Sequence, residues 1–231
     1  MKEKLMCCVF FAFLCLESVS QTSSEQMVWI QASEKLSLDS SNSVTFLFQR
    51  RIFLEKTHSY QHLYWLSLNH KMKGNVSLGC GAMYFTNNLI LYQELKSVPE
   101  FRPFQYVVIN RAIGYGSINL RFMVEERWLS NVSQDDIEPM DHFEMRCRVR
   151  LNSTTKLAKR YWLELSNEYF INGNLNVDEH FSQNRFSTLV QYKRSAIDVF
   201  AGYMHWLVNT SNGNESRHSW CVGIGHHFVY K

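Results

Sequence analysis

Residues 143–151 read FEMRCRVRL, and this stretch alternates apolar and charged side chains without a break. The apolar side chains belong to Phe143, Met145, Cys147, Val149 and Leu151. Glutamate or arginine fills every position between them. Because successive side chains of a β-strand point to opposite faces, the pattern predicts a half-buried strand, with the apolar face on a core and the charged face in solvent.

Further strand patterns occur through the first two thirds of the chain. Residues 118–125 alternate in the same way, and short apolar runs occupy 44–48, 89–92 and 106–109. Glycine, proline or acidic clusters separate these runs and predict turns at 79–81, 99–103 and 135–141. Several short strands with turns between them predict an antiparallel β-sandwich.

The last third of the sequence has a weaker pattern. Residues 189–207 place apolar side chains at roughly helical spacing, although two strands would also fit this stretch. We therefore expect a mixed or partly helical C-terminal extension over residues 166–231, after a β-sandwich domain over residues 21–165.

The first twenty residues are typical of a cleavable secretion signal. Lys2 and Lys4 precede an apolar run over residues 5–16, and small residues at 18 and 20 predict cleavage before Gln21. The remaining sequence has no apolar run of eighteen residues. These features predict a secreted, extracellular protein without membrane insertion.

Composition supports a folded chain with no general affinity for nucleic acid. Of the 231 residues, 45% are apolar and 14% are aromatic, which is enough for a packed core. The formal net charge of +3 gives no reason to expect a nucleic-acid partner.

Five Asn-x-Ser/Thr sequons predict a glycoprotein. They lie at Asn75, Asn131, Asn152, Asn209 and Asn214. In a secreted chain such sequons mark surface positions that carry sugar.

The predicted mature chain contains three cysteines, Cys80, Cys147 and Cys221. An odd number in a secreted protein implies a free thiol, a bridge between chains or a modified sulfur. One intrachain disulfide, Cys147–Cys221 or Cys80–Cys147, with the third cysteine buried, is one interpretation. A disulfide-linked homodimer is the alternative.

A basic stripe is the strongest candidate binding surface in the sequence. It contains Arg146, Arg148, Arg150, Lys156, Lys159 and Arg160. Arginines at alternate positions share one face of a strand, which predicts contact with a sulfated glycan or an acidic partner protein. A solvated outer face that keeps the sheet soluble is the competing interpretation.

The sequence contains no specific catalytic, metal or cofactor motif. Cys221 with His226 and His227 has the residue types of a thiol hydrolase, but no local signature surrounds them. The same histidines lack zinc-site spacing. We therefore expect a protein that is not an enzyme and has no cofactor, with a secreted hydrolase as the alternative.

Five short segments follow one another around the cysteines of the predicted sandwich domain. They are SLGC (77–80), PFQYV (103–107), IG (113–114), DHFEMRC (141–147) and YWL (161–163). Over roughly residues 27–165 this series of motifs resembles the oocyte-secreted and placenta-specific secreted proteins. It implies a single zona-pellucida N-type module, an immunoglobulin-like antiparallel sandwich.

This resemblance also implies a function and a modified disulfide framework. Two of the four framework cysteines are replaced, because apolar residues stand at Ala32 and Ile113. Each implied bridge thus keeps one cysteine, Cys80 or Cys147. The implied function is extracellular recognition of a protein or glycan, in a reproductive setting.

Overall fold

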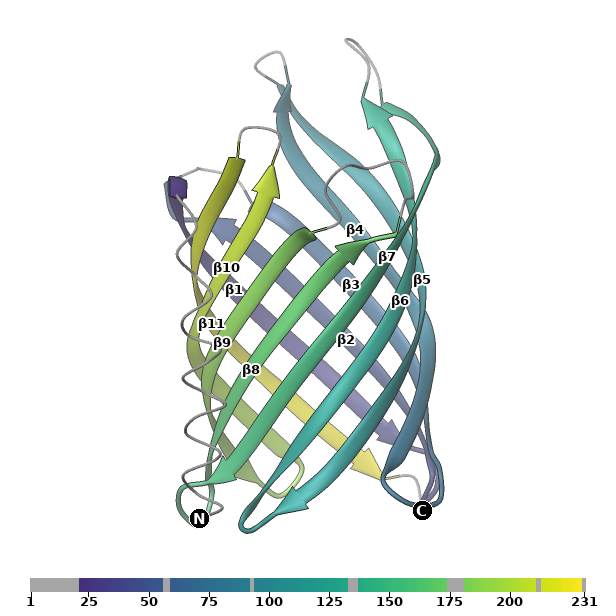
Figure 1. The fold of residues 1–231 in the computed structure, drawn as a ribbon, viewed down its shortest axis with the longest axis vertical. Helices are drawn as coiled ribbons and strands as arrows, with labels where there is room; N and C mark the ends of the chain where they lie inside the picture. Colours follow the sequence, from purple (N-terminus) through teal and green to yellow (C-terminus); the bar gives the residue numbers. More distant parts are fainter. Residues whose placement is uncertain are drawn as a thin grey trace.

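The computed structural model describes residues 21–55, 59–91, 94–132, 137–173, 181–210 and 213–229. The predicted secretion signal, residues 1–20, lies outside these ranges. The described residues form a single sheet that closes into a barrel (Figure 1). Among them, no helix is long and apolar enough to cross a membrane.

Eleven strands make up the barrel in the order of the sequence. Their bounds are β1 Gln21–Ser37, β2 Asn42–Phe53, β3 Ser59–Lys71, β4 Val76–Leu91, β5 Glu94–Ile113, β6 Gly116–Val132, β7 Ile137–Lys156, β8 Tyr161–Asn172, β9 Phe181–Arg194, β10 Ile197–Thr210 and β11 Gly213–Val229.

The number of strands fixes how the barrel closes. Consecutive strands pair antiparallel, so an odd count leaves the first and last strands pointing the same way. β1 and β11 accordingly pair in parallel, with Trp29 opposite Cys221. Closure gives every strand two hydrogen-bonded neighbours, which removes the open edges that would pair with other chains.

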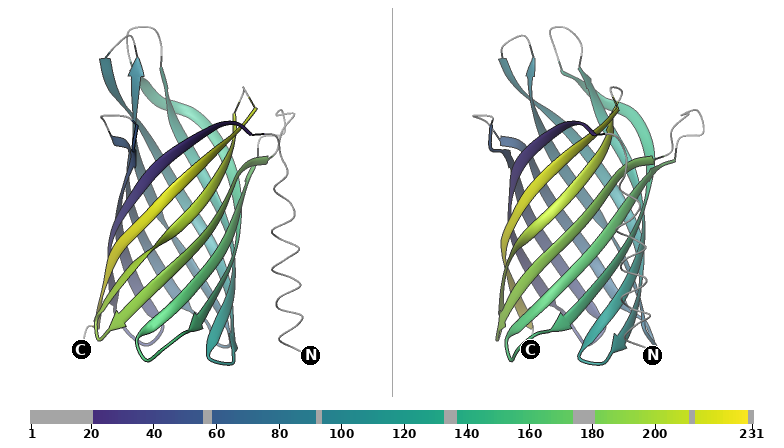
Figure 2. Two further views of the ribbon diagram at one scale, coloured as in Figure 1. Left: turned by 90° about the vertical axis from the view of Figure 1, so that its left-hand side faces the viewer. Right: turned by 60° about the vertical axis from the view of Figure 1, so that its left-hand side comes forward.

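The register gives the barrel its tilt and width. Following direct partners from Ser37 through β2 to β11 returns to β1 at Ser23, fourteen residues away. With eleven strands, this stagger corresponds to a strand tilt of about 40° and a radius of about 11 Å. The tilt is visible in both views of Figure 2. Because the stagger is an even number of residues, each inward-facing residue pairs with inward-facing residues on both neighbouring strands.

Both the predicted sandwich and the predicted helical extension are wrong. The described residues contain one closed barrel and no helix. Residues 189–207 form most of the β9–β10 hairpin, whose turn places Ser195 at a φ of 53°. The apparent helical spacing combined apolar residues from both faces of two strands. β8 also continues through the predicted domain boundary at residue 165.

Two predicted turns lie within strands. Gly79 and Gly81 belong to β4 and face inward, where an added Cβ would lie 2.3 Å from the Tyr106 ring and 2.8 Å from the Phe104 ring. These glycines therefore make room for aromatic side chains of β5. Pro99 and Pro103 lie within β5. The β5–β6 pairing is interrupted at Pro103, which has no N–H to donate.

A side chain at Gly81 should destabilise the barrel. In Gly81→Ala the new Cβ would lie 2.1 Å from the backbone oxygen of Leu66, so the β3–β4 pairing must shift. We expect a loss of about 1–3 kcal/mol, as in other overpacked interiors, measured by urea unfolding of the full chain. Gly225→Ala is the control, because its nearest contact is the Ser33 hydroxyl at 3.1 Å. Equal losses in the two variants would contradict the assigned role of Gly81.

Candidate functional site in the barrel lumen

The distribution of polarity across the barrel wall is the reverse of a soluble fold. In β7, Arg146 and Arg148 are only 3% and 8% exposed, whereas Phe143 and Met145 are 42% and 41% exposed. The alternation over residues 143–151 is therefore confirmed as a strand, but the predicted orientation of its two faces is wrong. The arginines point into the barrel, and the apolar residues point out.

The same polarity is found on the other strands. On β3, the outward residues Tyr64, Leu66 and Leu68 are all exposed and lie between His62 and His70. A run of three or four outward apolar residues between polar ones recurs around the wall. Further runs are Val44, Phe46 and Phe48 before Arg50 on β2, Ile118, Leu120, Phe122 and Val124 before Glu126 on β6, and Trp220, Val222 and Ile224 between His218 and His226 on β11.

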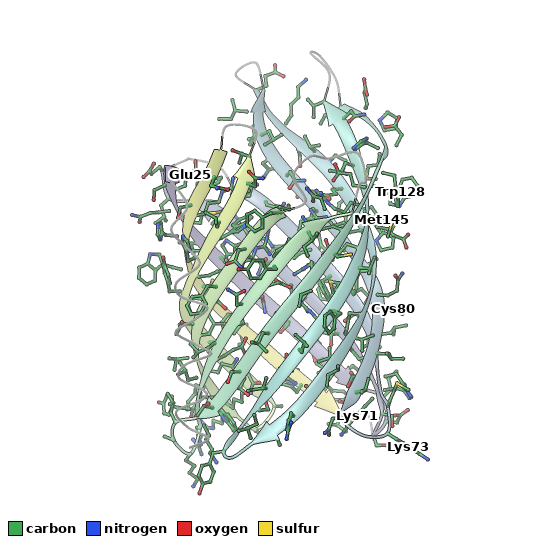
Figure 3. The ribbon with its side chains drawn as sticks, in the orientation of Figure 1. Glu25, Lys71, Lys73, Cys80, Trp128 and Met145 are labelled. Atoms are coloured by element: carbon green, nitrogen blue, oxygen red, sulfur yellow. The ribbon has the colours of Figure 1, made fainter. Side chains whose placement is uncertain are left out.

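These runs form a band around the outside of the barrel, here called the apolar band. Cys80, Trp128 and Met145 point away from the barrel axis in the side-chain view (Figure 3). Successive outward residues are two positions apart, so a run of three or four spans about 10–15 Å along the barrel axis from its first residue to its last.

Inside the barrel, Glu125 of β6 is the centre of a charge network. Its side chain is fully buried. One carboxylate oxygen accepts hydrogen bonds from Arg146, at 2.9 Å from Nε and 2.6 Å from Nη2. The other oxygen accepts a hydrogen bond from Nη1 of Arg148. Arg102 Nη1 lies 3.8 Å from the oxygen that Arg146 bonds.

A second buried glutamate extends the network from β6 to β5. Glu100 of β5 accepts hydrogen bonds from Arg102 at 2.5 and 2.6 Å and from Arg127 at 2.7 Å. Arg127 also bonds Glu144 at 2.6 Å.

On the other side of Glu125, Glu168 of β8 accepts hydrogen bonds from Arg148 at 2.8 and 3.1 Å and from Arg121 at 2.6 Å. The luminal charge network therefore crosses four adjacent strands, β5 to β8. Its members are Glu100, Arg102, Arg121, Glu125, Arg127, Glu144, Arg146, Arg148 and Glu168.

A different arrangement covers the opposite wall, from β9 through β11 to β2. Trp29 and Trp206 meet edge to face with ring centres 5.5 Å apart. The Arg51 guanidinium lies 3.9 Å from the Trp29 ring centre, and those of Arg185 and Arg217 lie 4.5 and 4.6 Å from the Trp206 ring centre. These five residues are called the Trp–Arg cluster.

A cavity of about 1070 Å³ lies between the network and the cluster. Arg102, Arg146 and Arg148 line it from one side, and Trp29 and Arg51 from the other. It continues to the β1–β2 turn, where Asp39 also lines it. A hydrogen bond from the Asn42 side chain, together with backbone N–H groups of Ser41 and Asn42, lowers the pKa of Asp39.

The structure divides the predicted basic stripe. Arg146 and Arg148 belong to the luminal network, and Arg150 lines the cavity with Glu164 at 3.4 Å. Lys156, Lys159 and Arg160 are exposed at the β7–β8 turn. The stripe is therefore not one continuous outer surface.

The three candidate disulfide cysteines are free and lie apart. Cys80 and Cys147 are exposed, whereas Cys221 is buried and lines the cavity. Two strands separate β4 from β7, so Cys80 and Cys147 are about 14 Å apart across the sheet at ordinary strand spacing. A disulfide needs Cα atoms within about 7 Å. The predicted Cys80–Cys147 bridge is therefore wrong for this fold. The predicted Cys147–Cys221 bridge is also wrong, because Cys147 is exposed on β7 whereas Cys221 is buried on β11, four strands away.

The sequons occupy contrasting positions. Asn75 and Asn131 are exposed, while Asn209 and Asn214 are half-buried near the β10–β11 end. Asn152 faces inward and is only 5% exposed. Its side chain therefore faces the lumen and not the outer surface, where sequons carry sugar.

The candidate thiol-hydrolase residues are not brought together. Cys221 faces the lumen, whereas His226 is outward and lies 2.8 Å from Glu34 of β1. His227 contacts Asp198 at 3.0 Å. In the described ranges, no three His, Cys, Asp or Glu side chains gather in a way that would hold a metal ion.

Comparison with protein families gives one match. The family described as "Protein of unknown function (DUF2490)" matches residues 26–217. This chain belongs to the DUF2490 family. The match contradicts the predicted membership of the oocyte-secreted family and its zona-pellucida module. A search of curated proteins and a search of solved structures found no match.

Sequence reasoning missed the glutamates that organise the DUF2490 lumen. The candidate site residues predicted from the sequence include none of Glu100, Glu125 and Glu168. Each lies on a strand at an even spacing from another inward charged residue, as Glu125 does from Arg121 and Arg127. Charges with this spacing on several apolar strands are the signal for a charged interior.

Removing the charge of Glu125 should be far more costly than removing that of Glu144. Glu125→Gln leaves Arg146 and Arg148 without their shared carboxylate in a buried site, for which a loss of about 3–5 kcal/mol is typical. Glu144 is 30% exposed and bonds only Arg127 of the network, so Glu144→Gln should cost about 1 kcal/mol or less. Urea unfolding measures both, and equal effects would contradict the central position of Glu125.

Proposed function

We propose that this protein is a membrane-spanning β-barrel of the outer-membrane type, with a polar, charged lumen. The observation that supports the proposal is the inverted polarity of the wall. Apolar side chains form a continuous outer band, while arginines and glutamates are buried inside. A soluble ligand-binding barrel would have the opposite arrangement, because water would surround its outer face.

The chemistry of lipid supports this proposal. A bilayer core offers no hydrogen bonds to the backbone, so only helices and closed barrels cross it. This sheet closes completely, and its outward apolar side chains alternate with inward ones that include the luminal charge network and the Trp–Arg cluster. Known transmembrane barrels combine a closed sheet with a polar interior in the same way. The apolar band is shorter than the usual outer-membrane band of about 25 Å. Local thinning of the bilayer accommodates a mismatch of this kind.

The two ends of the barrel also differ. At one end the segments between strands are 38–41, 72–75, 114–115, 157–160 and 195–196, all of two to four residues. At the other end the β4–β5 and β6–β7 hairpins rise well above the rest of the wall (Figures 1 and 2). Outer-membrane barrels combine short turns on one side with longer extensions on the other.

An arginine in the apolar band should impair insertion into lipid. Phe122 is outward and lies in the middle of the β6 run. For Phe122→Arg we expect a loss of about 2–4 kcal/mol, the cost of this side chain at the bilayer midplane. The measurement is urea-dependent folding of the full chain into phospholipid vesicles.

Phe228→Arg is the matched control for this experiment. Phe228 is also outward and exposed, but it lies near the end of β11 beyond His226. A loss of about 0–1 kcal/mol is expected there, near the interface. Equal stability of the two variants, or a wild-type chain that stays monomeric in water without detergent, would rule out the membrane proposal.

Cysteine labelling provides a test that needs no change in stability. Cys80 and Cys147 are outward within or beside the apolar band, so a charged maleimide supplied on both sides of the vesicle membrane should not react with them. A Tyr115→Cys variant should react at once, because Tyr115 lies in a turn and is 85% exposed. Rapid labelling of Cys80 in intact vesicles would indicate an outer wall in contact with water.

The predictions of a secreted protein without membrane insertion remain open to these same experiments. A soluble, extracellular glycoprotein would fold without lipid and tolerate Phe122→Arg. Extracellular recognition through the arginines of β7 has little support, because Arg146 and Arg148 face the lumen. We therefore prefer a membrane-spanning barrel to a secreted recognition protein.

A further inference from the structure

We propose that the Trp–Arg cluster binds a small divalent oxyanion, of the phosphate or sulfate class, inside the barrel. Arg51 and Arg185 would bind the anion from two sides. The inference concerns the lumen and holds whether the barrel resides in a membrane or in water.

Arg51 and Arg185 differ from the arginines of the luminal charge network in that they form no ion pair in the described part of the chain. The network on β5 to β8 pairs every arginine with at least one glutamate. Within the described residues, neither Arg51 nor Arg185 has a carboxylate oxygen within 4.0 Å. Glu168 stands opposite Arg185 in the β8–β9 register but is already bonded to Arg148 and Arg121. Two guanidinium groups without an ion pair in one enclosed space favour a bound anion.

The partners of these two arginines are neutral amides. Arg51 donates to the Gln49 side-chain oxygen at 2.9 and 2.7 Å and also to that of Gln61. Arg185 donates to the Gln183 side-chain oxygen at 3.1 Å. Amide oxygens orient the guanidinium groups but leave their full positive charge in place.

The Trp–Arg cluster also contains two hydrogen-bond donors that have no acceptor in the described ranges. Nε of Arg185 and Nε1 of Trp29 are both buried, and neither has a hydrogen-bond partner. Trp29 itself is 7% exposed. Buried donors are nearly always satisfied in folded proteins, so two orphans on adjacent side chains indicate a missing acceptor. An oxyanion supplies several acceptors at once.

The geometry brings the two arginines within reach of one ligand. Their guanidinium carbons lie 3.9 Å and 5.2 Å from the same Trp29 ring centre. The two carbons are thus no more than about 9 Å apart, a span that one tetrahedral oxyanion bridges with hydrogen bonds of about 2.7–2.9 Å on each side. Both arginines and both tryptophans line the cavity of about 1070 Å³, which has room for such a group.

Arg217 completes the cluster but is not an anion ligand in this proposal. It pairs with Glu215 at 2.5 Å and with the Tyr60 hydroxyl at 3.3 Å. Its charge is therefore compensated, like that of Arg150 by Glu164. These two residues provide arginines in the same lumen that should not contribute to specific binding.

The test is titration of the folded full chain in detergent with inorganic phosphate and with sulfate, followed by calorimetry at constant ionic strength. We expect saturable binding of both dianions and none with chloride. Arg51→Gln and Arg185→Gln should each weaken binding about tenfold to a hundredfold, the effect of losing a charged hydrogen-bonding group. Arg150→Gln, which removes an equal charge from the lumen, should change the affinity less than threefold.

A second variant addresses the folding of the arginine mutants. Trp29→Phe keeps an aromatic ring for Arg51 and removes the unused N–H donor together with part of the indole ring. It should fold and bind the anion more weakly than the wild type. Near-ultraviolet circular dichroism verifies folding of each variant.

Several outcomes would overturn the proposal. They are no saturable binding of phosphate or sulfate, equal weakening by Arg150→Gln and Arg51→Gln, and unchanged affinity in Trp29→Phe. Each of these is measured without a bilayer, so a failed anion site is distinguished from a failed membrane assignment, which rests on Phe122→Arg in vesicles.

Discussion

The bidentate contact between Glu125 and the arginines of β7 is the interaction on which the rest of the barrel depends. A fully buried carboxylate needs several donors, and Glu125 obtains them from Arg146 and Arg148. These contacts tie β6 to β7. Through Glu100 and Glu168 the same network reaches β5 and β8. Over β5 to β8, charge pairing therefore acts beside apolar packing, which comes from a buried cluster that includes Met83, Phe104 and Met123.

The network also fixes the register of the strands. A slip of one residue would turn every side chain of a strand to the other face. In β7 such a slip would expose Arg146 and Arg148 on the apolar band and bury Phe143 and Met145 among charges. Both of these placements are unfavourable. The register of the charged strands is therefore specified more strongly than in a sheet that is polar on both faces.

The strands could be predicted from sequence, but the inside of the barrel could not. A period of two identifies residues 143–151 as a strand, yet it is symmetric between the two faces. The choice of the apolar face as the core assumed water outside. Gly79, Gly81 and Pro103 were interpreted as turns because single-residue propensities ignore what a neighbouring strand requires. Tyr106 and Phe104 need the space that the two glycines leave.

The lumen is divided into two walls of different chemistry. On β5 to β8 the arginines are held by glutamates, whereas on β9 to β11 and β1 to β2 arginines rest on tryptophan rings. Every arginine of the first wall has a carboxylate partner, which suits that wall to a structural role. The second wall keeps positive charge beside the cavity, together with two buried donors that have no partner among the described residues. The family match over residues 26–217 includes both walls, so this division belongs to the segment that defines the family.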